Sequence, residues 1–340
     1  MNSANNYSIL GIDCVVYGSP DLAMAKKIYS DWGLHPRSET DQKLEFTCGN
    51  GGEIIVWNEN APGLPPRFKD GSNFREVLWG VASAESLRAI GAELASDREV
   101  REDADGTLHS VDDSGVNIGF RVSRCGDNKP AEEPIYNTIG NYRRIDRRAT
   151  IHDRAMPWRM GHIGFRVDNV LGLERFYMER LGFWLSDRYA EGGASFLRCS
   201  RKNDHHNLFL SRSPSTDTMF HHVAFEVRDI HEVFGGGLAF SRAGWDTQVG
   251  PGRHPVSSSY FWYFKNPLGG AIEYFSDTDI ATEAWQPVDY AEPKFSEWHL
   301  VDGIKIPPSS MTPSSLAIAR ERNAQARAAA GANAGGEIKQ

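Results

Sequence analysis

A histidine-bearing apolar strand occurs twice in the second half of the chain, and this repetition constrains the fold more than any other feature. The two segments read GHIGFRV at residues 161–167 and HHVAFEV at residues 221–227. Successive residues of a strand face opposite sides, so His162 lies on the opposite face from the apolar row of its own segment. A third apolar segment, AIEYF at residues 271–275, places Glu273 in the same way.

Two histidines and one glutamate on apolar strands are the ligand set of a mononuclear non-haem metal site with open positions. The predicted ligands are His162, His222 and Glu273. Alignment of HIGF with HVAF selects His222 over its neighbour His221, which we expect to face the opposite side of the strand. A solvated polar position would explain one such residue, but three equivalent positions in a repeated unit favour a metal site.

The two histidine strands open two copies of a longer unit, at residues 160–211 and 219–276. Each copy reads as a strand, an amphipathic helix and three short strands, with the helices at 169–181 and 230–243. The first half carries a fainter copy of the same plan. The sequence therefore predicts an α+β protein of two domains, in which each domain consists of two paired βαβββ modules that form a curved, incomplete barrel.

Composition and repeat boundaries divide the chain into four parts. We predict an N-terminal domain at 1–122, a linker rich in charge and proline at 123–158, a metal-binding domain at 159–276 and an extension at 277–340. The extension is polar, and its alanine-rich part at 317–336 is predicted to be a helix that fades into a disordered tail.

The first half serves as an internal control for the metal site. Superposition of the repeats places Cys14, Glu76 and Gly119 where the second half has its three candidate ligands. Because the glycine supplies no ligand, we expect the N-terminal domain to hold no metal and to have a packing role.

Bulk properties exclude several classes of function. The 340 residues carry a formal net charge of -8, which disfavours binding to a nucleic-acid backbone. No apolar run approaches the roughly 20 residues of a membrane span, and the N-terminus has no features of a signal peptide. The four cysteines form no CxxC pair, which is typical of buried thiols in a reducing compartment. We therefore expect a cytoplasmic protein without nucleic-acid or membrane partners.

Residues 7–276 resemble the vicinal oxygen chelate superfamily and, within it, the type I extradiol ring-cleaving dioxygenases. That family has a signature of glycine, histidine, tyrosine, an Asx-Pro pair, glycine and the ligand glutamate, which is matched here by Gly252, His254, Tyr263, Asn266-Pro267, Gly269 and Glu273. One position departs from the pattern, because Trp262 stands where the family usually has an aliphatic residue or phenylalanine.

The resemblance implies a mechanism and a set of partners. It implies Fe(II), with Mn(II) as the substitute, bound by His162, His222 and Glu273, and a catechol cleaved outside its two hydroxyls by dioxygen. A histidine of the His205-His206 pair would be the acid/base residue, and we favour His206. His254 and Tyr263 would hold the deprotonated oxygen of the substrate. We expect a homo-oligomer that acts on a substituted or bicyclic catechol.

Other functions use the same ligand set or fold. The alternatives are an oxygenase similar to 4-hydroxyphenylpyruvate dioxygenase, a hydroquinone-cleaving oxygenase, a glyoxalase-type isomerase and a non-enzymatic binding protein. The aromatic residues Trp184, Phe196, Phe209 and Trp262 fit either an aromatic substrate pocket or a strand-rich core, and the sequence leaves both open.

Overall fold

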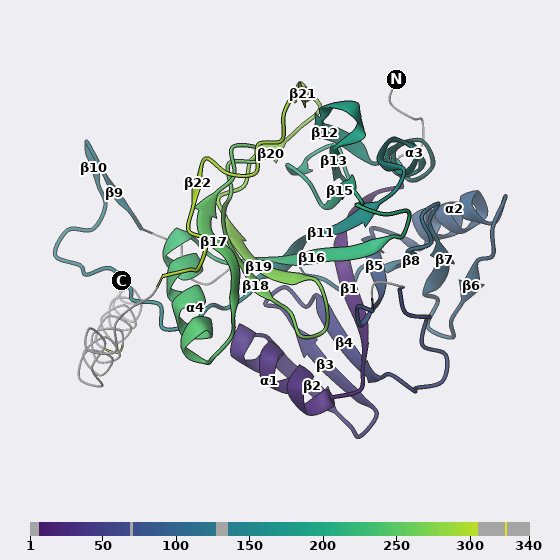
Figure 1. The fold of residues 1–340 in the computed structure, drawn as a ribbon, viewed down its shortest axis with the longest axis horizontal. Coiled ribbons are helices and arrows are strands. Elements are labelled where there is room, and N and C mark those ends of the chain that lie inside the picture. The colour runs from purple at the N-terminus through teal and green to yellow at the C-terminus, as the bar shows by residue number, and fades with distance from the viewer. Residues whose placement is uncertain (1–6, 69–70, 127–134, 305–323, 325–340) are drawn as a thin grey trace, which may run out of the picture.

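The computed structural model describes residues 7–68, 71–126, 135–304 and 324 of the chain (Figure 1). Strands dominate, and they form an eight-stranded sheet in the first half and a ten-stranded sheet in the second. Both sheets are open, with distinct edge strands, and a few short helices accompany them. The predicted α+β class with two sheet-rich domains and incomplete barrels is therefore confirmed.

The first half contains two modules. Its elements are β1 (Ile9–Ser19), α1 (Leu22–Trp32), β2 (His35–Glu39), β3 (Lys43–Thr47), β4 (Glu53–Asn58), β5 (Phe74–Val81), α2 (Ala84–Leu94), β6 (Arg101–Glu102), β7 (Leu108–Val111) and β8 (Asn117–Val122). No apolar pattern marks β2 in the sequence, because all five of its residues are exposed. A small hairpin of β9 (Asn137–Thr138) and β10 (Asn141–Tyr142) lies in the predicted linker.

The second half repeats the plan. Its elements are β11 (Arg159–Val167), α3 (Val170–Arg175), a π-helical turn (Phe176–Arg180), β12 (Trp184–Tyr189), a 3-10 turn (Ala190–Gly192), β13 (Ala194–Arg198), β14 (Asn203–Asp204), β15 (Leu208–Arg212), β16 (Met219–Glu226), α4 (Ile230–Arg242), β17 (Thr247–Arg253), β18 (Tyr260–Lys265) and β19 (Ala271–Ser276). The predicted helix at 169–181 is thus a short α-helix continued by a π-helical turn.

Strand pairing shows that the four modules share one topology. In every module the first strand runs parallel to the last, as β1 with β4, β5 with β8, β11 with β15 and β16 with β19. The first strands of paired modules, β1 with β5 and β11 with β16, run antiparallel. Each sheet is therefore built around two adjacent central strands that are equivalent in the repeat.

Each module helix begins at a side chain that caps its free N–H groups. Asp21, Ser83, Asn169 and Asp229 each accept a hydrogen bond from the backbone N–H three residues later, at 2.8 to 3.1 Å. Such caps stabilise a helix by about 1 kcal/mol each. The short polar residue before each apolar-periodic segment therefore fixes where the helix starts.

The buried core is continuous between the two halves. The Trp32 ring of α1 stacks on Tyr274 of β19, with ring centroids 3.5 Å apart and planes 8° apart. The Tyr274 hydroxyl donates a hydrogen bond of 2.7 Å to the carbonyl of Trp32. Phe74 of the first half stacks on Phe220 of the second at 4.8 Å. The first half therefore supports the back of strand β19, whose opposite face carries Glu273.

The described part of the extension spans both edges of the ten-stranded sheet. β20 (Ile280–Ala281) pairs with β14, β21 (Val288–Tyr290) pairs with β12, and β22 (Trp298–His299) pairs with β17. β12 and β17 lie near opposite ends of the strand order, so the chain crosses between the two ends of the open sheet (Figure 1). The predicted alanine-rich helix at 317–336 lies outside the described residues, apart from Ala324.

Among the described residues, no helix has the length and apolar character needed to cross a lipid bilayer. The domain boundaries given above remain predictions.

We expect Trp32→Ala to lower the free energy of unfolding by about 3–5 kcal/mol, because it leaves a large cavity in the core shared by the two halves. Urea denaturation followed by circular dichroism measures this change. Met24→Ala, on the exposed side of the same helix, serves as the control and is expected to change stability by about 0.5 kcal/mol or less. Equal effects of the two substitutions would contradict the role given to Trp32.

Candidate metal centre

Three adjacent strands carry the predicted ligands. His162 lies on β11, His222 on β16 and Glu273 on β19, which are consecutive neighbours in the ten-stranded sheet. In the strand register Ala224 is opposite both His162 and Glu273, so the small side chain at 224 lies between the two. The repeat therefore places the three side chains on one face of the sheet.

A glycine makes room for one of the imidazoles. A β-carbon at Gly164 would lie 2.6 Å from the ring of His222, closer than real β-carbon contacts. Gly164 pairs directly with His222 in the register. The second glycine of GHIGF is therefore required by the close approach of the His222 ring.

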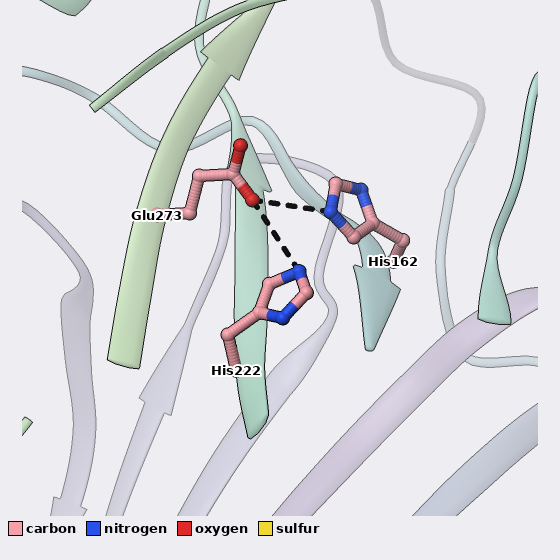
Figure 2. A group of neighbouring side chains, drawn as sticks. All are labelled: His162, His222 and Glu273. Atoms are coloured by element: carbon pink, nitrogen blue, oxygen red, sulfur yellow. Dashed lines mark hydrogen bonds and ion pairs between the residues drawn. The ribbon is translucent and has the colours of Figure 1, made fainter. Parts of the chain in front are cut away.

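The three side chains converge on a common point (Figure 2). The Nε2 atom of His162 lies 3.1 Å from the Oε2 atom of Glu273, and the Nε2 atom of His222 lies 3.5 Å from the same oxygen. One donor atom from each residue lies within 4.8 Å of the other two. Among the described residues, this is the one group of histidine, cysteine and acidic side chains that meets this criterion.

Unsatisfied buried atoms show that the donor set fits a cation. His222 Nε2 and Glu273 Oε1 are fully buried and lack a hydrogen-bond partner among the described residues. Such atoms cost free energy unless a ligand or ion satisfies them. A divalent metal ion bound by the two Nε2 atoms and the carboxylate would remove both deficits.

The protonation states also suit a metal ion. Burial would raise the pKa of Glu273, but its interactions with the rings of His162, His254 and His222 hold it well below its usual range. Burial, together with the neighbouring His221 and His162, lowers the pKa of His222 well below its usual value. An ionised carboxylate and a neutral imidazole are the forms that bind metal ions.

Two of the three residues, His162 and His222, line a cavity of about 110 Å³. Its walls combine aromatic side chains with several polar groups from the second half and from the extension. They are formed by His162, Tyr189, Phe196, Phe209, His206, His221, His222, His254, Val256, Ser257, Ser259, Tyr263, Lys294 and Phe295. Of the six predicted site residues all but Glu273 line this cavity, and Oε2 of Glu273 lies 3.1 Å from His162 and 3.5 Å from His222.

The structure distinguishes the two histidines of the His205-His206 pair. His206 lines the cavity, and its ring lies 4.3 Å from that of His162. His205 is fully buried behind it, where its Nε2 atom lies 2.9 Å from Oδ2 of Asp187. The Nδ1 atoms of the two histidines are 3.2 Å apart. His206 is therefore the member of the pair that borders the cavity.

His254 and Tyr263 form a hydrogen-bonded pair beside Glu273. His254 Nε2 lies 3.2 Å from the Tyr263 hydroxyl and 3.8 Å from Glu273 Oε1. The Nδ1–H of His254 donates to the carbonyl of Phe295 at 2.5 Å. Because a carbonyl only accepts, a neutral His254 has its proton on Nδ1 and a lone pair on Nε2.

The expectation for His221 was wrong. Its ring lines the same cavity as His222, and the Nδ1 atoms of the two residues are 2.6 Å apart. The reason is a β-bulge: Gly164 pairs with His222 and Phe165 with Phe220, so His221 is an extra residue that breaks strict alternation. Burial and the charge of Arg166 lower the pKa of His221 to about 4, which keeps the ring neutral.

Of the four aromatic residues that fit either a substrate pocket or the core, two line the cavity and two do not. Phe196 and Phe209 line the cavity. Trp262 is buried in the core, and Trp184 lies beside the guanidinium of Arg198 at 5.4 Å.

The equivalent positions of the first half have a different environment. Cys14 is fully buried, and burial raises the pKa of its thiol well above the usual value. Glu76 is engaged by Nδ1 of His109 at 2.7 Å. At Gly119 a β-carbon would lie 2.3 Å from the side chain of Leu78. These contacts leave a protonated thiol and a paired carboxylate in place of the donor set of the second half.

Sequence reasoning missed several residues around the cavity. Asp187 lies eighteen positions before His205, and no sequence motif connects the two residues. Lys294 and Phe295 come from the extension, whose polar composition suggested little structure.

Comparisons with known proteins agree with this architecture. Residues 159–274 match the family model described as the Glyoxalase/Bleomycin resistance protein/Dioxygenase superfamily. The chain is 28% identical over 298 residues to metapyrocatechase 2 of Cupriavidus necator, and the alignment covers 86% of this chain and 89% of the relative.

Two solved structures have the same fold. The Mn(II)-bound glyoxalase from Novosphingobium aromaticivorans aligns with a TM-score of 0.68 at 20% identity, over 91% of this chain and 99% of that one. The 2,2',3-trihydroxybiphenyl 1,2-dioxygenase from Sphingomonas wittichii strain RW1 aligns with a TM-score of 0.66 at 20% identity, over 86% of this chain and 98% of that one.

We expect His162→Ala, His222→Ala and Glu273→Ala each to abolish stable iron binding, because each removes one of three donors. Metal analysis after anaerobic loading with Fe(II) and desalting measures the iron content per chain. His109→Ala, which alters the equivalent region of the first half, is the control and should retain the wild-type iron content. Full iron occupancy in all three ligand variants would overturn the assignment.

Proposed function

We propose that this protein is an Fe(II)-dependent extradiol dioxygenase that acts on a catechol. The premise is that residues 159–274 form a domain of the glyoxalase/bleomycin resistance protein/dioxygenase superfamily. The observation that carries the proposal is the shared cavity. One cavity contains two histidines of the His162, His222 and Glu273 group together with His206, His254 and Tyr263. A protein that only binds a metal ion has no need of His206, His254 and Tyr263 beside the ligands.

A divalent ion held by His162, His222 and Glu273 would supply coordination positions for a vicinal diol and for dioxygen, and it would lower the pKa of a bound hydroxyl. Two neutral imidazoles and one carboxylate suit Fe(II), and Mn(II) is the alternative.

His254 and Tyr263 would orient the substrate. Burial raises the pKa of Tyr263 well above its usual value, and the charge of Glu273 raises it further, so the phenol keeps its proton. The hydroxyl has one proton, which Tyr263 can donate to Nε2 of His254 or, with substrate bound, to a deprotonated substrate oxygen. His254, held by the carbonyl of Phe295, fixes the position of the Tyr263 hydroxyl. Tyr263 is thus placed to bind one oxygen of the diol, and His254 to position Tyr263.

His206 would act as the acid/base residue. Burial and the neighbouring His162 lower its pKa well below the usual value, so its ring is neutral before substrate binds. Its Nδ1 atom faces His205, and no protein hydrogen-bond partner is found for Nε2 among the described residues. Nε2 is therefore the atom that takes a proton from a substrate hydroxyl and later returns it.

The cavity wall favours an aromatic substrate with a substituent. Phe196 and Phe209 pack against each other with ring centroids 5.0 Å apart, and Phe295 lies across the cavity beside Tyr263 at 6.4 Å. Aromatic walls contribute mainly apolar contact area and ring stacking. These contacts support a substituted or bicyclic catechol as the substrate.

A metal-dependent isomerase is the second candidate, because a manganese-bound glyoxalase shares the fold. Such an enzyme would turn over its substrate without consuming dioxygen. Measurement of dioxygen consumption during turnover therefore distinguishes a dioxygenase from an isomerase.

We expect the iron-loaded protein to consume one dioxygen per catechol and to form a yellow ring-cleaved product. The measurement is oxygen uptake with an electrode, combined with absorbance, over a panel of simple, alkyl and aryl catechols after anaerobic Fe(II) reconstitution. The metal-free protein is the control and should be inactive. No oxygen uptake with any member of the panel would contradict the proposal.

We expect His206→Gln to lower kcat by roughly 10²–10⁴, the usual contribution of a general acid/base residue, with unchanged iron content. Steady-state kinetics with metal analysis tests this, and the exposed His35→Gln is the control. A wild-type kcat in His206→Gln would exclude the acid/base role.

A further inference from the structure

We propose that Asp187 and His205 are positioning residues that fix the ring proton of His206 on Nδ1 and so leave Nε2 as a proton acceptor at the cavity. The inference rests on the proposed function, because it concerns the residue that exchanges a proton with the substrate. It assigns a role to two buried residues that do not line the cavity.

The three side chains form a continuous hydrogen-bonded chain. Asp187 Oδ2 lies 2.9 Å from His205 Nε2, and His205 Nδ1 lies 3.2 Å from His206 Nδ1. Asp187 is 1% exposed and His205 is 0% exposed, whereas His206 borders the cavity. The chain therefore runs from a buried carboxylate to the edge of the candidate metal centre.

The chemistry of the donors sets the direction of each hydrogen bond. An ionised carboxylate only accepts, so His205 donates through Nε2–H to Asp187. A neutral imidazole carries one ring proton, so His205 Nδ1 is then an acceptor. It must receive its hydrogen bond from Nδ1–H of His206. The single ring proton of a neutral His206 is thereby placed on Nδ1, and its Nε2 lone pair is free.

The carboxylate is itself held in place by the fold. Its other oxygen, Asp187 Oδ1, accepts a hydrogen bond of 2.7 Å from the backbone N–H of Val288, the first residue of β21. A β-bulge interrupts the pairing of β12 with β13 between Leu185 and Asp187. Bulges change the direction of side chains next to them, so the bulge accounts for the inward side chain of Asp187.

The extension also fixes the ring of His205. The Trp285 ring lies against His205 with centroids 5.4 Å apart and planes at 77°. The backbone N–H of His205 donates to the carbonyl of Asp279 at 2.7 Å. Both contacts come from the segment after the predicted catalytic domain. The extension therefore contributes to catalysis by orienting His205 and Asp187, in addition to covering the cavity with Phe295.

The arrangement has a consequence for proton transfer. When Nε2 of His206 takes a proton from a substrate hydroxyl, the ring becomes an imidazolium with protons on both nitrogens. The Nδ1–H of that cation still donates to Nδ1 of His205, so the hydrogen-bonded chain from Asp187 stays intact during the transfer. Return of the same proton to the product restores the neutral ring, so no proton is gained or lost over the cycle.

Replacement of Asp187 by asparagine is expected to reverse the donor and acceptor roles along the hydrogen-bonded chain from residue 187 to His206. The N–H of Val288 needs an acceptor, so the amide oxygen of Asn faces Val288 and the amide NH2 faces His205. His205 must then accept through Nε2 and donate through Nδ1, which forces His206 to carry its proton on Nε2. In the serine-protease triad, the corresponding substitution puts the histidine in the wrong tautomer and lowers kcat by about 10⁴.

The direct test is the tautomer of His206. Nitrogen NMR of the full chain, with ¹⁵N-labelled histidine and Zn(II) in place of iron, should show a proton on Nδ1 and none on Nε2 of His206 in the wild type. D187N should show the reverse. A proton on Nε2 in the wild type, or the same tautomer in both proteins, would overturn the inference.

Kinetics provide a second, independent readout. We expect D187N to lower kcat by roughly 10²–10⁴, with the iron content unchanged and KM changed by less than about threefold. The matched control is D112N, since Asp112 is also a buried carboxylate that accepts several hydrogen bonds but lies away from the cavity. Equal losses of kcat per folded molecule in D187N and D112N would mean that Asp187 has only a structural role.

The two tests separate this inference from the proposed function. If wild-type protein cleaves catechols while D187N keeps the wild-type kcat and tautomer, the inference fails and the function stands. If the wild type cleaves no catechol, the function fails, and the NMR result still decides the tautomer of His206.

Discussion

The site depends on one buried carboxylate. Glu273 has no exposed surface, and one of its oxygens lacks a hydrogen-bond partner among the described residues. Its other oxygen faces the Nε2 atoms of His162 and His222. An ionised carboxylate in such surroundings is costly unless positive charge compensates it. A bound divalent ion would supply that charge, and the strands, Gly164 and the packing of the first half keep the three donors together.

The duplicated module explains how the chain achieves this arrangement. Equivalent strands β11 and β16 lie side by side, and β19 follows β16 in parallel, so equivalent positions meet on one face. The opposite face of β19 is fixed by the stack of Tyr274 on Trp32 from the first half. The N-terminal half has a buried thiol and a paired glutamate at its own equivalent positions, and it contributes rigidity to the half that carries the candidate metal centre. Strand β19 therefore carries Tyr274, which packs on the first half, on one face and Glu273, a candidate metal ligand, on the other.

The sequence predicted the module plan and the three candidate ligands because both follow from periodicity and repetition. It could not predict features that break periodicity. His221 lines the cavity because a bulge adds a residue to β16, and Asp187 points inward next to a bulge between β12 and β13. Phe295 reaches the site from a polar extension that crosses between the two edges of the sheet. Tertiary contacts of this kind leave no local pattern. The homo-oligomeric state and the cytoplasmic location remain predictions.

The most direct test of the central claim is an anaerobic crystal structure of the iron(II)-loaded protein with a catechol bound. We predict one iron ion bound by Nε2 of His162, Nε2 of His222 and a carboxylate oxygen of Glu273 at roughly 2.0–2.2 Å, with both catechol oxygens on the metal. An ion bound elsewhere would contradict the account, as would a fourth protein ligand from His206 or His221 that occupies a position needed by the substrate.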